Sequence, residues 1–311
     1  MRSLRFHRTG PALDVIRLEE ADVPTPGPGQ IRVAVRVCGL TPADWALAGG
    51  LFAGDLPRGI GLEAAGTVDA VGANVTGVEV GDEVFGPVPF TGPTAGASDH
   101  ALMDVFFHRP EGLDPAAAAA LPMAVETAHR GLDGLGVRRD TAPGLTVLVH
   151  GAGSTVGYAA TQIALRYGAR VIATAGTRHA DALRRLGAEV TGYGEGMADR
   201  VRELVGGPVD LAFDAAPVSN SLPEVVRTVA KPEDALTMSD FAAARELGVR
   251  FQFGEEGHEY HNHVLPEYAR LAAEGEFSIP LAGIHPLDRW REAAELSLSG
   301  KPGGKLVLQV R

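Results

Sequence analysis

The segment from residue 147 to residue 157 limits the possible folds of this chain more than any other. It reads Val-Leu-Val-His-Gly-Ala-Gly-Ser-Thr-Val-Gly. An apolar run typical of a buried parallel strand comes first, then a glycine turn, then a stretch with helical periodicity. Such a turn lets backbone amides approach a pyrophosphate, and the start of the helix favours an anion. The segment therefore predicts a dinucleotide-binding loop, with a plain tight turn as the alternative.

The glycines of this loop stand at 151, 153 and 157, one residue wider than the usual fingerprint. Repeated strand and helix patterns follow: strands at 146–149, 170–174, 211–213, 235–238 and 249–253, with helices at 156–167 and 179–186. This alternation predicts an α/β fold with a Rossmann doubly wound parallel sheet. The expected cofactor-binding residues of the loop are Gly151, Ala152, Gly153, Ser154, Thr155, Val156 and Gly157.

The end of the second strand predicts which dinucleotide binds. NAD sites usually carry an Asp or Glu there, about twenty residues after the loop. This chain has Ala-Gly-Thr-Arg at 175–178 instead, so no carboxylate repels a 2′-phosphate, and Thr177 and Arg178 are donors for one. The sequence therefore favours NADPH. Alternatively, Arg178 is a solvated arginine at a helix start; Tyr193 either covers the same phosphate or is a surface tyrosine.

The part of the chain before residue 110 predicts short strands and turns instead of alternating strands and helices. Residues 24–29 form a rigid Pro/Gly turn, and residues 30–38 alternate apolar and polar side chains as a half-buried strand does. Further strands are expected at 61–71 and 78–85, which together suggest a compact barrel-like β domain. From residue 276 the chain returns to short β-like pieces, and its last strand, within 303–310, is expected to fold back onto this domain.

Length and charge exclude several function classes. The 311 residues have room for two domains, and the net charge of −11 with scattered basic residues gives no footprint for nucleic acid. The first residues lack the apolar core of a signal peptide, and no uncharged run is long enough to span a bilayer. Cys38 is the single cysteine, so no intrachain disulfide can form. We expect a cytoplasmic protein.

Taken together, these motifs resemble the zinc-free quinone oxidoreductase branch of the medium-chain dehydrogenase/reductase superfamily. The resemblance covers nearly the whole chain in the right order. Its marks are Gly-Leu-Glu-Ala-Ala-Gly-Thr-Val at 61–68, Val-Gly-Asp-Glu-Val-Phe-Gly at 80–86, Leu-Pro at 121–122 with Thr-Ala at 127–128, the glycine loop, and Gly-Lys-Pro-Gly-Gly-Lys at 300–305.

The resemblance implies a GroES-like β-barrel catalytic domain built from residues 1–118 and 275–311, with a Rossmann domain at 119–274 inserted between them. It implies an active site in the cleft between these domains, with Thr127 beside the nicotinamide. It also implies a homodimer formed through the edge strand of the Rossmann sheet, at 249–253.

Catalytic zinc is not expected. Zinc-dependent relatives place Cys and His where this chain has Thr41 and Leu62, and neither of these side chains is a zinc ligand. Cys38 lies a turn too early, and a buried thiol there is usually an apolar filler. His258, His261 and His263 are close enough to share a metal if the chain turns, but a polar loop opening a helix at 265–273 is favoured. A role of this loop at the mouth of the cleft stays open.

The resemblance also predicts the chemistry. Hydride from NADPH would attack an activated double bond or a quinone, and a hydrogen-bond donor would stabilise the charge on the carbonyl oxygen. Quinone-reductase relatives often show Asn-Pro-x-Asp-Tyr where this chain has Thr-Pro-Ala-Asp-Trp at 41–45. The donor would then be Thr41, with Trp45 as an aromatic wall. The alternative is that Asp44 caps a helix and Trp45 is in the core. His129 and His150 are given no chemical role.

We therefore expect a reductase of quinones or α,β-unsaturated carbonyls acting on a small molecule. The alternatives are an enoyl-thioester reductase, a specialised-metabolite reductase, or a nucleotide-binding protein without reductase turnover.

Overall fold

The computed structural model describes residues 1–217, 219–252 and 260–311 of the chain. These residues form two compact units. The first unit consists of Met1–Met123 and Asn262–Arg311, and the second unit is Ala124–His261. The domain limits expected above, residues 1–118 with 275–311 and residues 119–274, stay a prediction.

The second unit is built on a parallel sheet of six strands. Their order is β11 (Glu189–Thr191), β10 (Arg170–Thr174), β9 (Thr146–His150), β12 (Leu211–Asp214), β13 (Ala235–Thr237) and β14 (Arg250–Phe251). All neighbours pair in parallel. The sheet grows outward from β9 in both directions, which is the strand order of a doubly wound fold. The expected Rossmann sheet is therefore confirmed.

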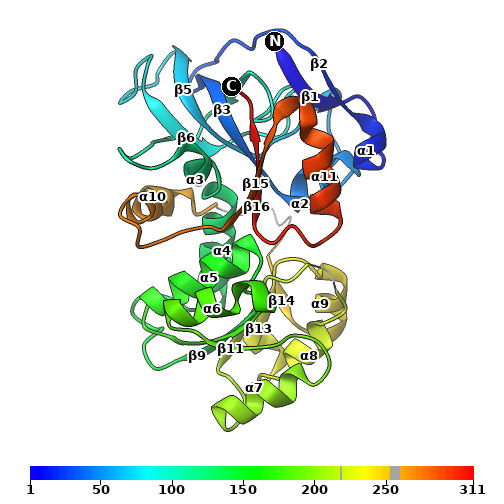
Figure 1. Cartoon of the computed structure of the whole chain (residues 1–311), viewed down its shortest axis with the longest axis vertical. Coiled ribbons are helices and arrows are strands. Elements are labelled where there is room, and N and C mark those ends of the chain that lie inside the picture. Colours follow the sequence, from blue (N-terminus) through cyan, green and yellow to red (C-terminus); the bar gives the residue numbers. More distant parts are fainter. Residues whose placement is uncertain (218, 253–259) are drawn as a thin grey trace. The chain divides into compact units, whose positions relative to one another are not determined.

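Helices alternate with these strands along the chain (Figure 1). They are α4 (Pro122–Leu135), which begins in the first unit, α5 (Thr155–Arg166), α6 (Thr177–Leu186), α7 (Met197–Val205), α8 (Leu222–Val226) and α9 (Phe241–Leu247), with the short 3-10 helix η1 (Pro232–Asp234). Helix α5 packs on β9 and β10, while α8 packs on β12 and β13. Helix α6 ends at Gly187, whose φ of +107° suits glycine.

Two sheets make up the first unit. The larger has the order β15 (Leu281–Pro286), β16 (Lys305–Gln309), β3 (Ile31–Leu40), β5 (Glu63–Val71), β6 (Glu83–Pro87) and β8 (Phe107–His108), and β7 (His100–Met103) also pairs with β3. The smaller contains β2 (Ile16–Glu20), β1 (Arg2–Phe6) and β4 (Arg58–Gly59). Strand β3 alternates as expected: Ile31, Val33 and Val35 are fully buried, whereas the residues between them are partly exposed.

The C-terminal strand β16 pairs antiparallel with β3, so the end of the chain folds back onto its beginning (Figure 1). The helices of this unit are α1 (Ala12–Val15), α2 (Pro42–Ala48), α3 (Pro115–Ala119), α10 (Leu265–Ala273) and α11 (Trp290–Leu298), with the 3-10 helices η2 (Asn262–Val264) and η3 (Leu287–Arg289).

Two expectations for the elements were wrong. The strand expected at 78–85 forms only at Glu83–Pro87, because residues 76–82 form a turn in which Gly77 and Gly81 have positive φ. The C-terminal segment was expected to consist of short β-like pieces, but it also contains α11. Trp290, Ala293 and Ala294 recur at helical spacing and are buried against the core of the first unit. Phe253, part of the expected edge strand, lies outside the described residues.

Candidate active site

The loop from Gly151 to Ser154 joins β9 to α5, as the sequence predicts. Gly151 has a φ of +74°, and a Cβ on it would lie 2.6 Å from backbone atoms of Ala216. A Cβ on Gly157 would lie 2.3 Å from the carbonyl oxygen of Gly151. Only glycine therefore fits at these two positions, and the start of α5 packs directly on the loop.

Gly153 differs from the other two glycines of the loop. The three atoms nearest to a Cβ there all belong to the side chain of His179, the closest at 3.1 Å, so a side chain rather than the backbone would have to shift. The packing of the protein therefore does not require glycine at this position. The absence of a side chain at Gly153 is what close approach of a ligand to the backbone would need.

The N-terminus of α5 has free hydrogen-bond donors. The Ser154 hydroxyl accepts the amide of Gly157 at 3.0 Å and donates to the carbonyl of Ala215 at 3.0 Å. In the part of the chain that the structure describes, the amides of Gly153, Thr155 and Val156 have no acceptor. Free amides at the start of a twelve-residue helix form an anion-binding site.

The second strand of the sheet ends beside the loop. After β10, Ala175 and Gly176 lead into α6, whose first residues Thr177 and Arg178 are exposed. A Cβ on Gly176 would lie 3.6 Å from the hydroxyl of Tyr193, so Tyr193 lies next to the start of α6. The structure thus places Tyr193 beside Gly176, which directly precedes Thr177 and Arg178. Binding of NADPH by these residues stays a prediction.

A buried carboxylate near the loop was not singled out from the sequence. Asp214 ends β12 and accepts the Thr237 hydroxyl at 2.7 Å and the Ala216 amide at 3.1 Å. Burial raises the pKa of Asp214 to about 6, although these two donors oppose the shift. It fixes the turn that contacts Gly151. The one feature of the sequence that could have indicated Asp214 is its place directly after the apolar run at 211–213.

In the first unit, Thr41 and Asp44 form a capping box at the start of α2. The Thr41 amide and hydroxyl donate to Asp44 Oδ2 at 2.7 and 3.1 Å, and the Gly61 amide donates to Asp44 Oδ1 at 2.8 Å. Burial raises the pKa of Asp44 to about 6 despite these donors. Asp44 therefore caps the helix, as the alternative interpretation of this motif held.

Trp45 lies in the core, as the alternative interpretation of the 41–45 motif held. It is 5% exposed within the core of the first unit, and its indole N–H donates to the Ser297 hydroxyl at 2.8 Å. Thr127 lies on α4, is half-buried, and its hydroxyl is 3.5 Å from Glu126 Oε2. The catalytic roles of Thr41, Trp45 and Thr127 stay predictions.

The segment that begins at Leu62 contains a buried ion pair. Leu62 is buried, and the next residue, Glu63, forms a buried ion pair with Lys305. The other carboxylate oxygen of Glu63 accepts the Met123 amide at 2.8 Å. Burial, together with the carboxylates of Asp44 and Glu63, raises the pKa of the Cys38 thiol well above its usual range. A protonated thiol is a poor metal ligand.

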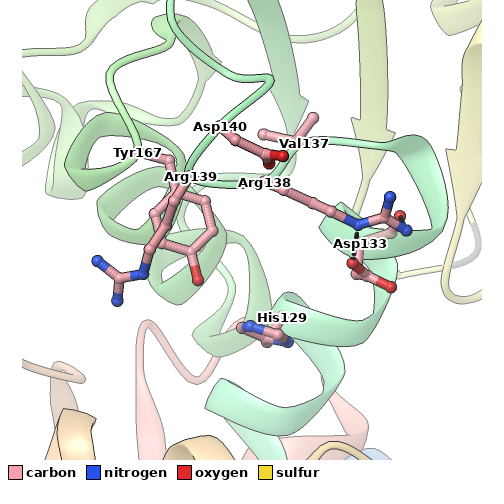
Figure 2. A pocket seen from close by; sticks show the side chains of 7 residues that line it. All are labelled: His129, Asp133, Val137, Arg138, Arg139, Asp140 and Tyr167. Atoms are coloured by element: carbon pink, nitrogen blue, oxygen red, sulfur yellow. Dashed lines mark hydrogen bonds and ion pairs between the residues drawn. The ribbon is translucent and has the colours of Figure 1, made fainter.

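A pocket of about 280 Å³ lies in the second unit, at the end of α4 (Figure 2). Arg138 points toward Asp133 and pairs with it, and the Arg139 guanidinium lies 4.8 Å from the ring centre of Tyr167. None of the predicted site residues lines this pocket. The full lining is His129, Asp133, Val137, Arg138, Arg139, Asp140 and Tyr167.

Two of the three histidines near residue 260, His261 and His263, belong to the described residues. His261 Nδ1 lies 3.0 Å from His129 Nδ1 in the second unit, whereas His263 belongs to η2 of the first unit. His258 lies outside the described residues. Among the residues described, no group of three or more potential metal ligands occurs. Within the same residues, no helix is both long and apolar enough to cross a membrane.

Two family models match the chain. One is described as the alcohol dehydrogenase GroES-like domain, at residues 27–105, and the other as zinc-binding dehydrogenase, at residues 155–239. They match the two parts of the chain in which the structure shows the β-rich unit and the parallel sheet.

Known proteins are similar over most of the chain. Erythronolide synthase EryA2 of Saccharopolyspora erythraea is 33% identical over 96% of this chain, which spans 8% of that protein. Human quinone oxidoreductase is 34% identical over 66% of this chain and 63% of its own length. The quinone oxidoreductase from Coxiella burnetii has a TM-score of 0.83 and 26% identity, covering 100% of this chain and 99% of that one. Two other polyketide synthases match about half of the chain.

Proposed function

The chain belongs to the medium-chain dehydrogenase/reductase superfamily, in its quinone oxidoreductase-like branch, and from this premise we propose that it is a zinc-independent, NADPH-dependent reductase. Its substrates in this proposal are small quinones or α,β-unsaturated carbonyl compounds.

The observation that carries the proposal is the loop between β9 and α5. The free amides of Gly153, Thr155 and Val156 fit a pyrophosphate, and the lack of a side chain at Gly153 would let that group come close to the backbone. Ser154 would hold the first turn of the helix in place through its bond to Gly157. When bound, the nicotinamide supplies the hydride.

A preference for NADPH over NADH is supported by charge. No carboxylate lies between β10 and α6, and the exposed Thr177 and Arg178 begin α6. A guanidinium binds a phosphate strongly through charge-assisted hydrogen bonds. Tyr193, next to Gly176, would cover this phosphate.

Independence from zinc is proposed although one matching family model is described as zinc-binding dehydrogenase. The support is the chemistry of Thr41 and Leu62, which lack the thiolate, imidazole or carboxylate that zinc requires. In this proposal Thr127 lies beside the nicotinamide, and Thr41 and Trp45 bound the substrate side. Thr41 can donate to a substrate oxygen only by giving up its bond to Asp44.

A second candidate is reduction of an enoyl thioester. It is favoured by the similarity to erythronolide synthase, which extends over 96% of the chain, and by the matches to other polyketide synthases. The chemistry would be the same hydride transfer to an activated double bond. The substrate would differ in carrying a thioester-bound pantetheine.

The test is to follow NADPH consumption, with NADH in parallel, against small quinones, simple enones and an enoyl-CoA, with and without a chelator. Turnover with NADPH that the chelator does not change is expected, with little turnover with NADH. Preference for enoyl-CoA over quinones and enones would favour the second candidate. Failure to bind either dinucleotide would overturn the proposal, and loss of turnover with chelator would overturn zinc independence.

A further inference from the structure

One imidazole connects three segments at the carboxyl edge of the parallel sheet. His150, the last residue of β9, is 3% exposed. Its Nδ1 lies 2.8 Å from the hydroxyl of Thr174, which ends β10, and its Nε2 lies 3.0 Å from the hydroxyl of Ser221, just before α8. Strands β10, β9 and β12 are neighbours, so these contacts lie at the edge where a doubly wound sheet binds its ligand.

Thr174 in turn holds the beginning of the glycine loop. Its hydroxyl accepts the Gly151 amide at 3.1 Å, and its backbone carbonyl accepts the Ala152 amide at 2.9 Å. The first two amides of the loop are thus fixed by one residue of the neighbouring strand. This leaves the later amides, those of Gly153, Thr155 and Val156, free for a ligand.

The available donors and acceptors fix which atom donates in each of these hydrogen bonds. Thr174 is fully buried, and in the described part of the chain His150 Nδ1 is the one acceptor within hydrogen-bond distance of its hydroxyl proton. The hydroxyl therefore accepts from Gly151 and donates to Nδ1, and the imidazole carries its own proton on Nε2 and donates it to Ser221. Each bond of this network then has a single direction, so the network holds Gly151 in one orientation.

We infer that His150 and Thr174 are positioning residues for the bound dinucleotide. They act through the Gly151 amide, which sets the path of the loop and the direction of its free amides. The inference rests on the proposed function, since it assumes that the loop binds a dinucleotide. A neutral imidazole agrees with this role, because burial lowers the pKa of His150 to about 4.

Substitutions can separate the two bonds of His150. His150→Gln places an amide nitrogen near the position of Nε2, which keeps the bond to Ser221 and loses the acceptor for Thr174. His150→Asn places an oxygen near Nδ1, which keeps that acceptor and loses the bond to Ser221. Thr174→Val removes the hydroxyl at nearly constant volume. Thr228→Val is the matched control, because Thr228 is equally buried and, within the described residues, its hydroxyl bonds only the carbonyl of Val225.

The experiment measures the Kd of NADPH for the whole chain by fluorescence, and the Kd of 2′-AMP by competition. We expect Thr174→Val and His150→Gln to weaken NADPH binding about tenfold, the equivalent of one hydrogen bond, with 2′-AMP binding unchanged because that ligand has no pyrophosphate. His150→Asn and Thr228→Val should bind NADPH within about twofold of the original chain. Melting temperatures report any general loss of stability separately.

Equal NADPH affinity of Thr174→Val and the original chain would overturn the inference while leaving the proposed function intact. So would an equal loss in Thr228→Val, since the effect would then follow from any buried hydroxyl. If the original chain binds neither NADPH nor NADH, the proposed function fails and the inference fails with it.

Discussion

At the scale of single residues, the proposed preference for NADPH depends on charge at the start of α6. Thr177 and Arg178 are both exposed there, and Tyr193 lies beside the preceding Gly176 with 63% of its surface exposed. A partly exposed guanidinium contributes through its charge-assisted bond to a phosphate rather than through packing. Its replacement should therefore change binding of the phosphorylated cofactor and leave the fold intact.

Arg178→Glu should raise the KM for NADPH at least tenfold and change the KM for NADH less than threefold, because a carboxylate repels only the 2′-phosphate. Steady-state kinetics with both cofactors measures this. Arg184→Glu, an exposed position on the same helix, is the matched control and should leave both KM values nearly unchanged. Equal effects on NADPH and NADH would contradict the assignment of Arg178 to the phosphate.

His150 should make the stability of the chain depend on pH in a defined direction. Burial lowers its pKa to about 4, whereas the unfolded chain titrates near its ordinary value of about 6.5. Between these values the unfolded state binds more protons than the folded state, so the stabilisation present at neutral pH is lost as pH falls.

Between pH 7 and pH 5, the original chain should lose about 2 kcal/mol more unfolding free energy than His150→Asn, which cannot titrate at this position. Urea unfolding at each pH gives the difference. The raised pKa values of Asp44 and Asp214 act in the opposite direction, but they are present in both proteins and cancel. Identical pH profiles would show that His150 is not kept neutral by the fold.

At the scale of elements, the junction of β9 with α5 combines two kinds of glycine. Gly157 is required by packing, because its Cβ would lie 2.3 Å from the carbonyl oxygen of Gly151. A Cβ on Gly153 would lie 3.1 Å from the His179 ring, so it is accommodated by a small shift of that side chain and not of the backbone. Substitution at Gly157 should therefore affect folding, whereas substitution at Gly153 should affect mainly binding of the proposed ligand.

Gly153→Ala should keep the melting temperature within a few degrees and weaken NADPH binding more than tenfold, since the methyl group fills the space that the pyrophosphate would use. Gly157→Ala should lower both stability and affinity. Gly207→Ala is a control, because a Cβ at Gly207 meets nothing within 4 Å. Calorimetry with and without NADPH measures both quantities, and normal affinity in Gly153→Ala would contradict a pyrophosphate at this loop.

At the scale of the whole molecule, the parallel sheet of the second unit has β14 as one of its edges. Its neighbour β13 pairs with it at Leu236 and Thr237, and the opposite side of β14 has no partner strand within the described residues. An unpaired edge can extend a sheet into a second copy of the chain. Dimerisation through this edge remains a proposal that follows from the family.

Sedimentation equilibrium should give a mass of twice 32.4 kDa at micromolar concentration. Hydrogen exchange should then show slower exchange of the β14 amides at high protein concentration than at low concentration. A monomer mass throughout the concentration range would contradict the proposed dimer. A dimer without protection of β14 would place the interface elsewhere.

The sequence alone determined the features that depend on neighbouring residues. Alternation predicted β3, the apolar run and glycine turn predicted β9 and its loop, and the three-residue spacing of Thr41 and Asp44 allowed for the capping box that forms. These patterns are local because strands, turns and helix caps are made by residues close together in the chain. Helix α11 was missed, since its short buried stripe becomes recognisable only against the core that it covers.

Tertiary structure alone decided the contacts between distant residues. Thr174 and Ser221 are 24 and 71 positions from His150, and nothing in the sequence indicates that one imidazole bonds both. Glu63 and Lys305 likewise form a buried pair from opposite ends of the chain. The physical reason is that a buried polar group must find its partner wherever the fold brings one close, and this depends on strand order rather than on spacing along the chain.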